Sequence, residues 1–187
     1  MKELFRKIYT YVLCKRYKIP YIGFKPGKGL TIINYRLGGV VIGRNTVIGQ
    51  RDILCSHSSQ SILEIGANTL IGRDSTISAI NSVIIEDDVL TGPHVFIADY
   101  NHEYQSPKIP IKNQGNRANK GDRVLIERGT WIGTNAVIVG NVHIGKNCVI
   151  GANSVVTKDI PDYCVVAGVP AKIIRKYDEL SNSWLRV

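Results

Sequence analysis

The chain has 187 residues, and its 24 Lys or Arg against 15 Asp or Glu give a formal net charge of +9. This length suits one substantial domain, and polar residues or Gly interrupt every apolar run well before the roughly 18 residues of a transmembrane helix. The sequence therefore argues against a membrane-spanning protein, and we expect the protein in the cytoplasm.

Residues 1–28 form the most basic part of the chain, with eight Lys or Arg and a single acid. Apolar side chains recur there at intervals of three and four, which predicts one apolar face of a helix; they are Leu4, Phe5, Ile8, Tyr9, Val12 and Leu13. Charged residues interleave with them, unlike in the apolar core of a secretory signal. We expect this helical segment to pack on the protein, with peripheral contact of residues 2–19 with an anionic membrane as the alternative.

A period of six residues begins near residue 40 and runs without a slip from residue 126 to residue 156. Its aliphatic positions there are Ile126, Ile132, Ile138, Ile144, Ile150 and Val156. Helices repeat at about 3.6 residues and strands at about 2, whereas six suits a solenoid with triangular coils. Asn135, Asn147 and Asn153 recur where a coil would turn a corner with positive φ. Residues 29–160 are thus predicted to form an all-β solenoid of stacked parallel strands, and 161–187 a closing strand and a C-terminal helix.

The repeat has one long interruption, between Ile97 and Ile126, and His102 stands near its start. Five cations follow within it, Lys108, Lys112, Arg117, Lys120 and Arg123. Long loops inside a compact fold are usually functional or disordered. We predict a loop insertion over 98–123 that leaves the solenoid wall and suits an anionic ligand.

Neither the cysteines nor the histidines have the spacing of a metal site. Cys14, Cys55, Cys148 and Cys164 lie far apart and are interpreted as reduced, packing thiols. Three converging imidazoles are not expected, because only His94 and His102 lie near one another. His57, His94 and His143 are interpreted as solvated or capping residues. We expect no metal, and no basic and aromatic motif indicates nucleic-acid binding.

Three segments resemble the hexapeptide-repeat acyltransferases, which fold as left-handed parallel β-helices. They read "IGRNTVIG", "IGANTLIGRDSTI" and "WIGTNAVIVGNVHIGKNCVIGANSVVTKDIPDYCVVAGVPAKIIR". The resemblance spans roughly residues 40–176 and is greatest to galactoside, maltose and polysaccharide O-acetyltransferases. It implies left-handed coils, which periodicity alone does not give, a homotrimer, and acetyl-CoA in the groove between neighbouring β-helices.

The resemblance also implies a site around the insertion. The family's catalytic histidine aligns with His102, which would take the proton of an acceptor hydroxyl as its oxygen attacks the acetyl thioester. Direct transfer of this kind needs no acyl-enzyme. Asp99 could orient the imidazole or cap a corner. Asn101 and Tyr104 are candidate walls of the acceptor pocket, and Trp131 could line it or pack between subunits.

Six further positions match the family's coenzyme A site. Small residues that would meet the pantetheine arm are Thr134 and Ala152, and residues that would meet the nucleotide end are Thr157, Lys158, Lys172 and Arg175. Cations hold phosphate by charge-assisted hydrogen bonds, although these could also be solvated cations at the end of the solenoid.

The predicted function is acetyl-CoA-dependent O-acetylation of a carbohydrate hydroxyl, on a surface polysaccharide or its precursor. A xenobiotic of the streptogramin type or an amino sugar is the alternative acceptor, and a scaffold trimer is a non-enzymatic one. The asparagine with which relatives contact sugar aligns with Gly72, so the resemblance implies a different way of holding the acceptor.

Overall fold

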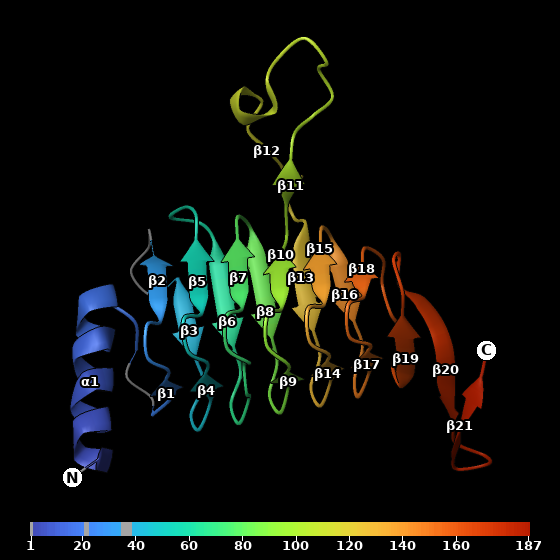
Figure 1. The fold of residues 1–187 in the computed structure, drawn as a ribbon, viewed down its shortest axis with the longest axis horizontal. Coiled ribbons are helices and arrows are strands. Elements are labelled where there is room, and N and C mark those ends of the chain that lie inside the picture. The colour runs from blue at the N-terminus through green and yellow to red at the C-terminus, as the bar shows by residue number, and fades with distance from the viewer. Residues whose placement is uncertain (1, 21–22, 35–38) are drawn as a thin grey trace.

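The computed structural model describes residues 2–20, 23–34 and 39–187, and within these ranges the chain forms a parallel β-solenoid with one α-helix at its N-terminal end (Figure 1). The helix, α1 (Lys2–Tyr17), lies across that end, beside β1 (Lys25–Pro26) and β2 (Thr31–Asn34). Among the described residues, no helix has the length and apolar character needed to cross a membrane.

The coils stack so that each side of the solenoid is a sheet. The first face has the order β2, β5 (Ile53–Ser56), β7 (Thr76–Ala79), β10 (Phe96–Ala98), β15 (Val137–Val139) and β18 (Val155–Val156). The second face consists of β3 (Val40–Ile42), β6 (Ile62–Ile65), β8 (Ser82–Ile85), β13 (Arg123–Ile126) and β16 (Val142–Ile144). The third face contains β9 (Leu90–Thr91), β14 (Trp131–Ile132), β17 (Val149–Ile150) and β19 (Cys164–Ala167), and β1 pairs with β4 (Val47–Ile48) on the same side.

The core consists of columns of aliphatic side chains, one from each coil. Ile77, Ile97 and Ile138 are direct neighbours in the first face, and each is at most 1% exposed. All six aliphatic positions of the unbroken repeat are buried to the same degree. Asn135, Asn147 and Asn153 have φ between 50° and 58°, as corner residues require. The predicted solenoid, its inward positions and these corners are therefore confirmed, while its left-handed sense stays a prediction from the resemblance.

The helix packs on the solenoid by a face different from the predicted one. Thr10, Leu13 and Cys14 are buried, whereas the other five predicted apolar residues are between 45% and 69% exposed. Placing Leu13 on one face with Leu4 and Ile8 was wrong. The helix has apolar side chains on two sides, and periodicity alone does not tell which side contacts the protein.

The predicted C-terminal helix is also wrong. Residues after β19 form an antiparallel extension of the third face, made of β20 (Lys172–Asp178) and β21 (Ser183–Arg186). Tyr177 and Trp184 are register partners, and their rings contact edge to face with centroids 5.4 Å apart. Branched and aromatic residues favour strands, and the open edge of β19 offers backbone partners that a helix would leave unused. The four cysteines are free and buried, as packing thiols should be.

Candidate active site

The insertion leaves the solenoid between β10 and β13 as a hairpin that projects from one edge (Figure 1). Its neck consists of β11 (Asn101–His102) and β12 (Asn116–Arg117), which pair antiparallel. A short 3₁₀ turn, η1 (Ile111–Asn113), lies in the loop beyond. The predicted interruption of the repeat is therefore a defined structure, and its strands hold the segment of the proposed base.

His102 lies in this neck with its side chain exposed, opposite Asn116 in the register. Its backbone N–H donates to Oδ1 of Asn101 over 2.9 Å. Among the described residues, no hydrogen-bond partner is found for the imidazole itself. Tyr104 is exposed two residues further along the loop. The geometry therefore leaves the His102 ring free to meet a ligand or a neighbouring chain.

Asp99 has a role different from orienting this ring. It is fully buried, and its Oδ1 accepts the backbone N–H of Ile80 over 2.8 Å. Its Oδ2 accepts the N–H groups of Asn81 and Ser82, each over 2.6 Å. Both oxygens are thus committed to the turn of the preceding coil, where the repeat slips by two residues. The prediction that Asp99 orients His102 has no support in this geometry. Asp99 instead caps backbone N–H groups, but those of the preceding coil and not of its own corner.

His57 belongs to a cluster that the sequence did not suggest. Its Nε2 lies 2.9 Å from Oγ of Ser78 and 3.2 Å from the hydroxyl of Tyr100. Ser78 and Tyr100 are also 3.0 Å apart, and Sγ of Cys55 lies 3.3 Å from the imidazole. Interpreting His57 as a solvated or capping residue missed these contacts. Cys55 and Ser78 are register partners, but the irregular stretch after Cys55 hides that register in the sequence.

His94 behaves as predicted, whereas His143 makes a side-chain contact that the solvated or capping interpretation did not include. His94 is exposed at a corner with φ 59°. His143 faces outward, and its Nε2 lies 2.6 Å from Oε1 of Glu127. Neither histidine hydrogen-bonds to the His57 cluster or to the neck of the insertion.

The residues predicted for the pantetheine arm share one corner of consecutive coils. Thr134 follows Gly133 and Ala152 follows Gly151, and the N–H of Asn153 donates to the carbonyl of Thr134 over 2.9 Å. A Cβ placed on Gly133 would lie 2.5 Å from the backbone nitrogen of Ala152, so the coils approach too closely for any side chain there. Ala152 is exposed and Thr134 is half-buried. This corner offers a narrow, smooth edge with backbone groups near its surface.

The residues predicted for the nucleotide end lie at the C-terminal end of the solenoid. Thr157 and Lys158 follow β18, and Lys172 and Arg175 lie on β20 rather than on a helix. The N–H of Ala171 donates to the carbonyl of Val155 over 2.8 Å, which ties the start of β20 to β18. All four side chains are exposed, so they are open to a ligand from solution.

Trp131 lies apart from the insertion, on the outer surface of the third face. Its register partners are Leu90 and Val149, and about half of its surface is exposed. Leu70 and Leu90 are exposed on the same row. A row of exposed apolar side chains of this kind fits the packing role that was considered for Trp131.

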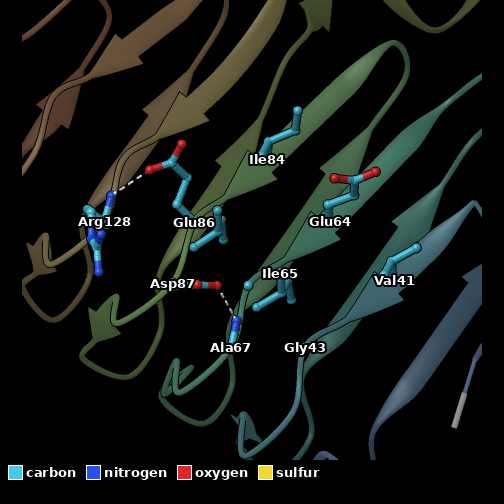
Figure 2. Close-up of a pocket in the computed structure, with 11 residues that line it drawn as sticks. Val41, Gly43, Glu64, Ile65, Ala67, Ile84, Glu86, Asp87 and Arg128 are labelled. Atoms are coloured by element: carbon cyan, nitrogen blue, oxygen red, sulfur yellow. Dashed lines mark hydrogen bonds between the residues drawn. The ribbon is translucent and has the colours of Figure 1, made fainter. Parts of the chain in front are cut away.

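A hollow of about 540 Å³ lies on the second face, away from all these residues. Figure 2 shows its lining, with Glu64 and Ile84 on neighbouring strands. Asp87 accepts the N–H of Ala67 over 2.6 Å, and Glu86 accepts that of Arg128 over 3.0 Å. Its three carboxylates outnumber its single guanidinium, so this surface would repel a cofactor rich in phosphate.

Two family models match the chain. Residues 123–158 match "Bacterial transferase hexapeptide (six repeats)", and residues 62–92 match "Hexapeptide repeat of succinyl-transferase". A putative lipopolysaccharide biosynthesis O-acetyl transferase of Escherichia coli is 40% identical over 154 residues, which cover 79% of this chain and 76% of that protein. The chain therefore belongs to the hexapeptide-repeat acyltransferase family.

Two further relatives extend the comparison. A probable acetyltransferase of Mycobacterium tuberculosis is 33% identical over 80% of this chain, and the match covers 48% of that protein. A hexapeptide-repeat-containing acetyltransferase of Vibrio cholerae, solved with acetyl coenzyme A, has a TM-score of 0.63 and is 27% identical. That structural match covers 75% of this chain and 72% of the other. This chain thus spans about half the length of the mycobacterial relative.

Proposed function

We propose that the protein is an acetyl-CoA-dependent O-acetyltransferase acting on a carbohydrate hydroxyl, with His102 as the general base. The observation that carries this proposal is the exposed imidazole of His102 at the neck of a hairpin that leaves a hexapeptide-repeat solenoid. The similarity to an O-acetyl transferase of lipopolysaccharide biosynthesis supports a surface polysaccharide or its precursor as the acceptor.

The proposed reaction is one direct transfer. His102 removes the acceptor's hydroxyl proton while the oxygen attacks the thioester carbonyl, and a tetrahedral intermediate forms. When that intermediate collapses, the C–S bond breaks and the sulfur leaves as coenzyme A thiolate, which takes up the proton. An imidazole suits this role because its ordinary pKa lies near neutral pH. Asp99 supports the base only through the backbone, since its carboxylate is bound to the preceding coil.

Coenzyme A would lie along the corner of Thr134 and Ala152, with its nucleotide end near Lys158 and Arg175. The coils stack closely at this corner and no side chain projects from Gly133, so the corner offers a smooth edge along which the thin pantetheine arm could lie. Thr157 and Lys172 complete the surface proposed for the phosphates. The solved Vibrio cholerae relative binds acetyl coenzyme A, which supports the same donor here.

The donor corner and the proposed base lie at opposite edges of the first face, one before the strands of that face begin and the other after they end. The strand β15 starts beyond Thr134, and its last residue, Val139, pairs with Ala98 just before the insertion. A groove between neighbouring chains would bring a base from one chain to a donor on the next. We therefore include a homotrimer in the proposal, with Trp131 packed at the contact between subunits.

The acceptor would enter beside the insertion. Its five cations favour an anionic saccharide or a nucleotide-linked sugar. Asn101 uses its Oδ1 for the His102 N–H, so its side-chain NH₂ remains available to a sugar oxygen. Tyr104 offers an exposed ring as one wall. An amino sugar or a xenobiotic of the streptogramin type is the second acceptor class, and ester against amide formation distinguishes O-acetylation from N-acetylation.

The proposal places the protein in the cytoplasm, with residues 2–19 in peripheral contact with the inner face of the membrane.

The test is thiol release from acetyl-CoA with a panel of sugars, glycan fragments and antibiotics. His102→Ala should lose activity by about 10² or more and keep its melting temperature, because the side chain is exposed. His94→Asn is the matched control, since asparagine tolerates the positive φ of that corner. A folded His102→Ala variant with parental activity would refute the proposed base.

A further inference from the structure

The helix α1 presents a second apolar surface on the side opposite its contact with the solenoid. Successive helical residues turn by about 100°, so Ile8 and Val12 lie roughly opposite Thr10 and Cys14, which are buried. The second surface, called here the outer face, consists of Leu4, Phe5, Ile8, Tyr11 and Val12, each between 48% and 69% exposed. Apolar side chains gathered in this way on a surface usually mark an interaction site.

The charges around the outer face have one sign. Lys15 and Arg16 are exposed along it, and Nζ of Lys15 lies 5.2 Å from the centre of the Tyr11 ring. Glu3 is the only acid among the first 28 residues. Apolar side chains flanked by Lys and Arg, with aromatic rings among them, are typical of helices that lie in the headgroup region of a membrane.

The helix is also oriented for such a contact. Figure 1 shows α1 lying across the end of the solenoid, transverse to the direction in which the coils stack. Leu13 and Cys14 hold its inner side, so the outer face is turned away from the rest of the protein. A flat surface that contacts the outer face would therefore touch the molecule at its N-terminal end, and the solenoid would stand away from it.

We propose that the outer face inserts into the headgroup region of an anionic membrane and holds the solenoid upright on it. A second copy is a poorer occupant, because two outer faces in contact would bring their cations together without an acid to pair them. This inference rests on the peripheral membrane contact of residues 2–19 in the proposed function, and it gives that contact a definite surface and an orientation. If the proposed homotrimer places three solenoids side by side in the same direction, their outer faces share one plane, and the three contacts add as avidity.

The test measures sedimentation of the full chain with vesicles of phosphatidylglycerol and phosphatidylethanolamine, compared with vesicles of phosphatidylcholine alone. The parent should bind the anionic vesicles, and salt should weaken binding by screening the cations. The double variant Ile8→Ser, Val12→Ser should bind the anionic vesicles at least about tenfold more weakly than the parent, because two inserted aliphatic side chains are lost. Lys15→Glu, Arg16→Glu should weaken binding while keeping every apolar side chain.

The matched control removes two exposed apolar residues at the other end of the molecule, Leu180→Ser with Val187→Ser. These positions are 99% and 81% exposed, and the control should bind vesicles like the parent. All variants should keep the parental melting temperature and thiol release with an acceptor in solution, so the outcome is independent of the role of His102. Binding unaffected by the Ile8 and Val12 substitutions, absence of parental binding, or equal binding to phosphatidylcholine would overturn the proposal. A change in oligomeric mass of the double variant would instead identify the outer face as a contact between copies.

Discussion

The hydroxyl of Tyr100 lies 3.2 Å from Nε2 of His57 and 3.0 Å from Oγ of Ser78, two residues before the proposed base. Three successive coils are thereby joined at the point where the insertion begins. Tyr100→Phe keeps the ring packed against His57 and removes the hydroxyl. We predict a loss of about 1 kcal/mol in the free energy of unfolding and a lower kcat, because the neck that carries His102 loses an anchor. Urea unfolding and thiol release measure the two effects, and Tyr104→Phe, on the exposed loop, should leave stability unchanged.

Asp99 provides a separate test of how the neck is held. Asp99→Ala leaves three N–H groups of the half-buried preceding turn without their acceptor, so the free energy of unfolding should fall by about 3 kcal/mol. Asp99→Asn keeps one oxygen and should lose less. The pH midpoint of the remaining activity should stay that of the parent in Asp99→Asn. A displaced midpoint would show that Asp99 acts on the His102 imidazole after all.

Asp52 should make stability depend on pH in the direction opposite to that of most carboxyl groups. Burial raises its pKa from 3.8 to about 6, against the opposing effect of the hydrogen bond from Ser75. Between these values the folded protein holds a proton that the unfolded chain has lost, so the free energy of unfolding should decrease as pH rises from about 4 to about 6. The loss should be complete above that range and amount to about 2 to 3 kcal/mol.

Asp52→Asn tests this assignment because it keeps an oxygen for the Ser75 N–H and removes the charge. The free energy of unfolding should decrease between about pH 4 and pH 6 in the parent by the amount given above, and Asp52→Asn should lack this decrease. Parallel curves would mean that Asp52 does not titrate in this interval.

The exposed cations at the C-terminal end should distinguish two forms of the cofactor. Lys158→Ala and Arg175→Ala should weaken coenzyme A by about 1 to 2 kcal/mol each and dephospho-coenzyme A much less. Calorimetric titration of both ligands measures the difference, with Lys146→Ala as an exposed control elsewhere. Equal weakening of the two ligands would remove the proposed phosphate contact.

Gly72 should not tolerate any larger residue. A Cβ there would lie 2.3 Å from the carbonyl group of Gly92 in the next coil, which is backbone and cannot move aside alone. Gly72→Ala should therefore destabilise the fold by about 3 kcal/mol, and Gly72→Asn by more. Gly151→Ala is the comparison, because its nearest contact would be 3.0 Å from a side-chain atom. Similar melting temperatures for the two variants would contradict this account of how the coils stack.

The parts of the fold that sequence predicts well are those that repeat. The six-residue period places Ile126 to Val156 in the core because each residue meets the same position in the next coil. Contacts that do not repeat are invisible to this argument. Asp99 finds its donors about 18 residues earlier in the chain, and His57 finds Ser78 across a stretch where the period is broken.

The two ends of the chain show the same limit. The strand β20 forms because β19 offers it an open edge, and no local pattern in residues 172–178 reports that edge. The helix at the other end was predicted correctly as a helix, but both of its sides are apolar. The insertion that carries the candidate base was predictable because the failure of the repeat is itself visible in the sequence, whereas the choice of His102 rests on the resemblance to the family.

The neck of the insertion has a further consequence for how this scaffold can change. The turn of the coil before it is closed by Asp99, and the strands β10 and β13 that flank it are paired with neighbouring coils independently of the loop. The segment between Glu103 and Gly115 is thus a cassette with its two ends fixed close together. Its length and chemistry can be exchanged while the solenoid keeps its register, which would let one framework serve a succession of acceptors.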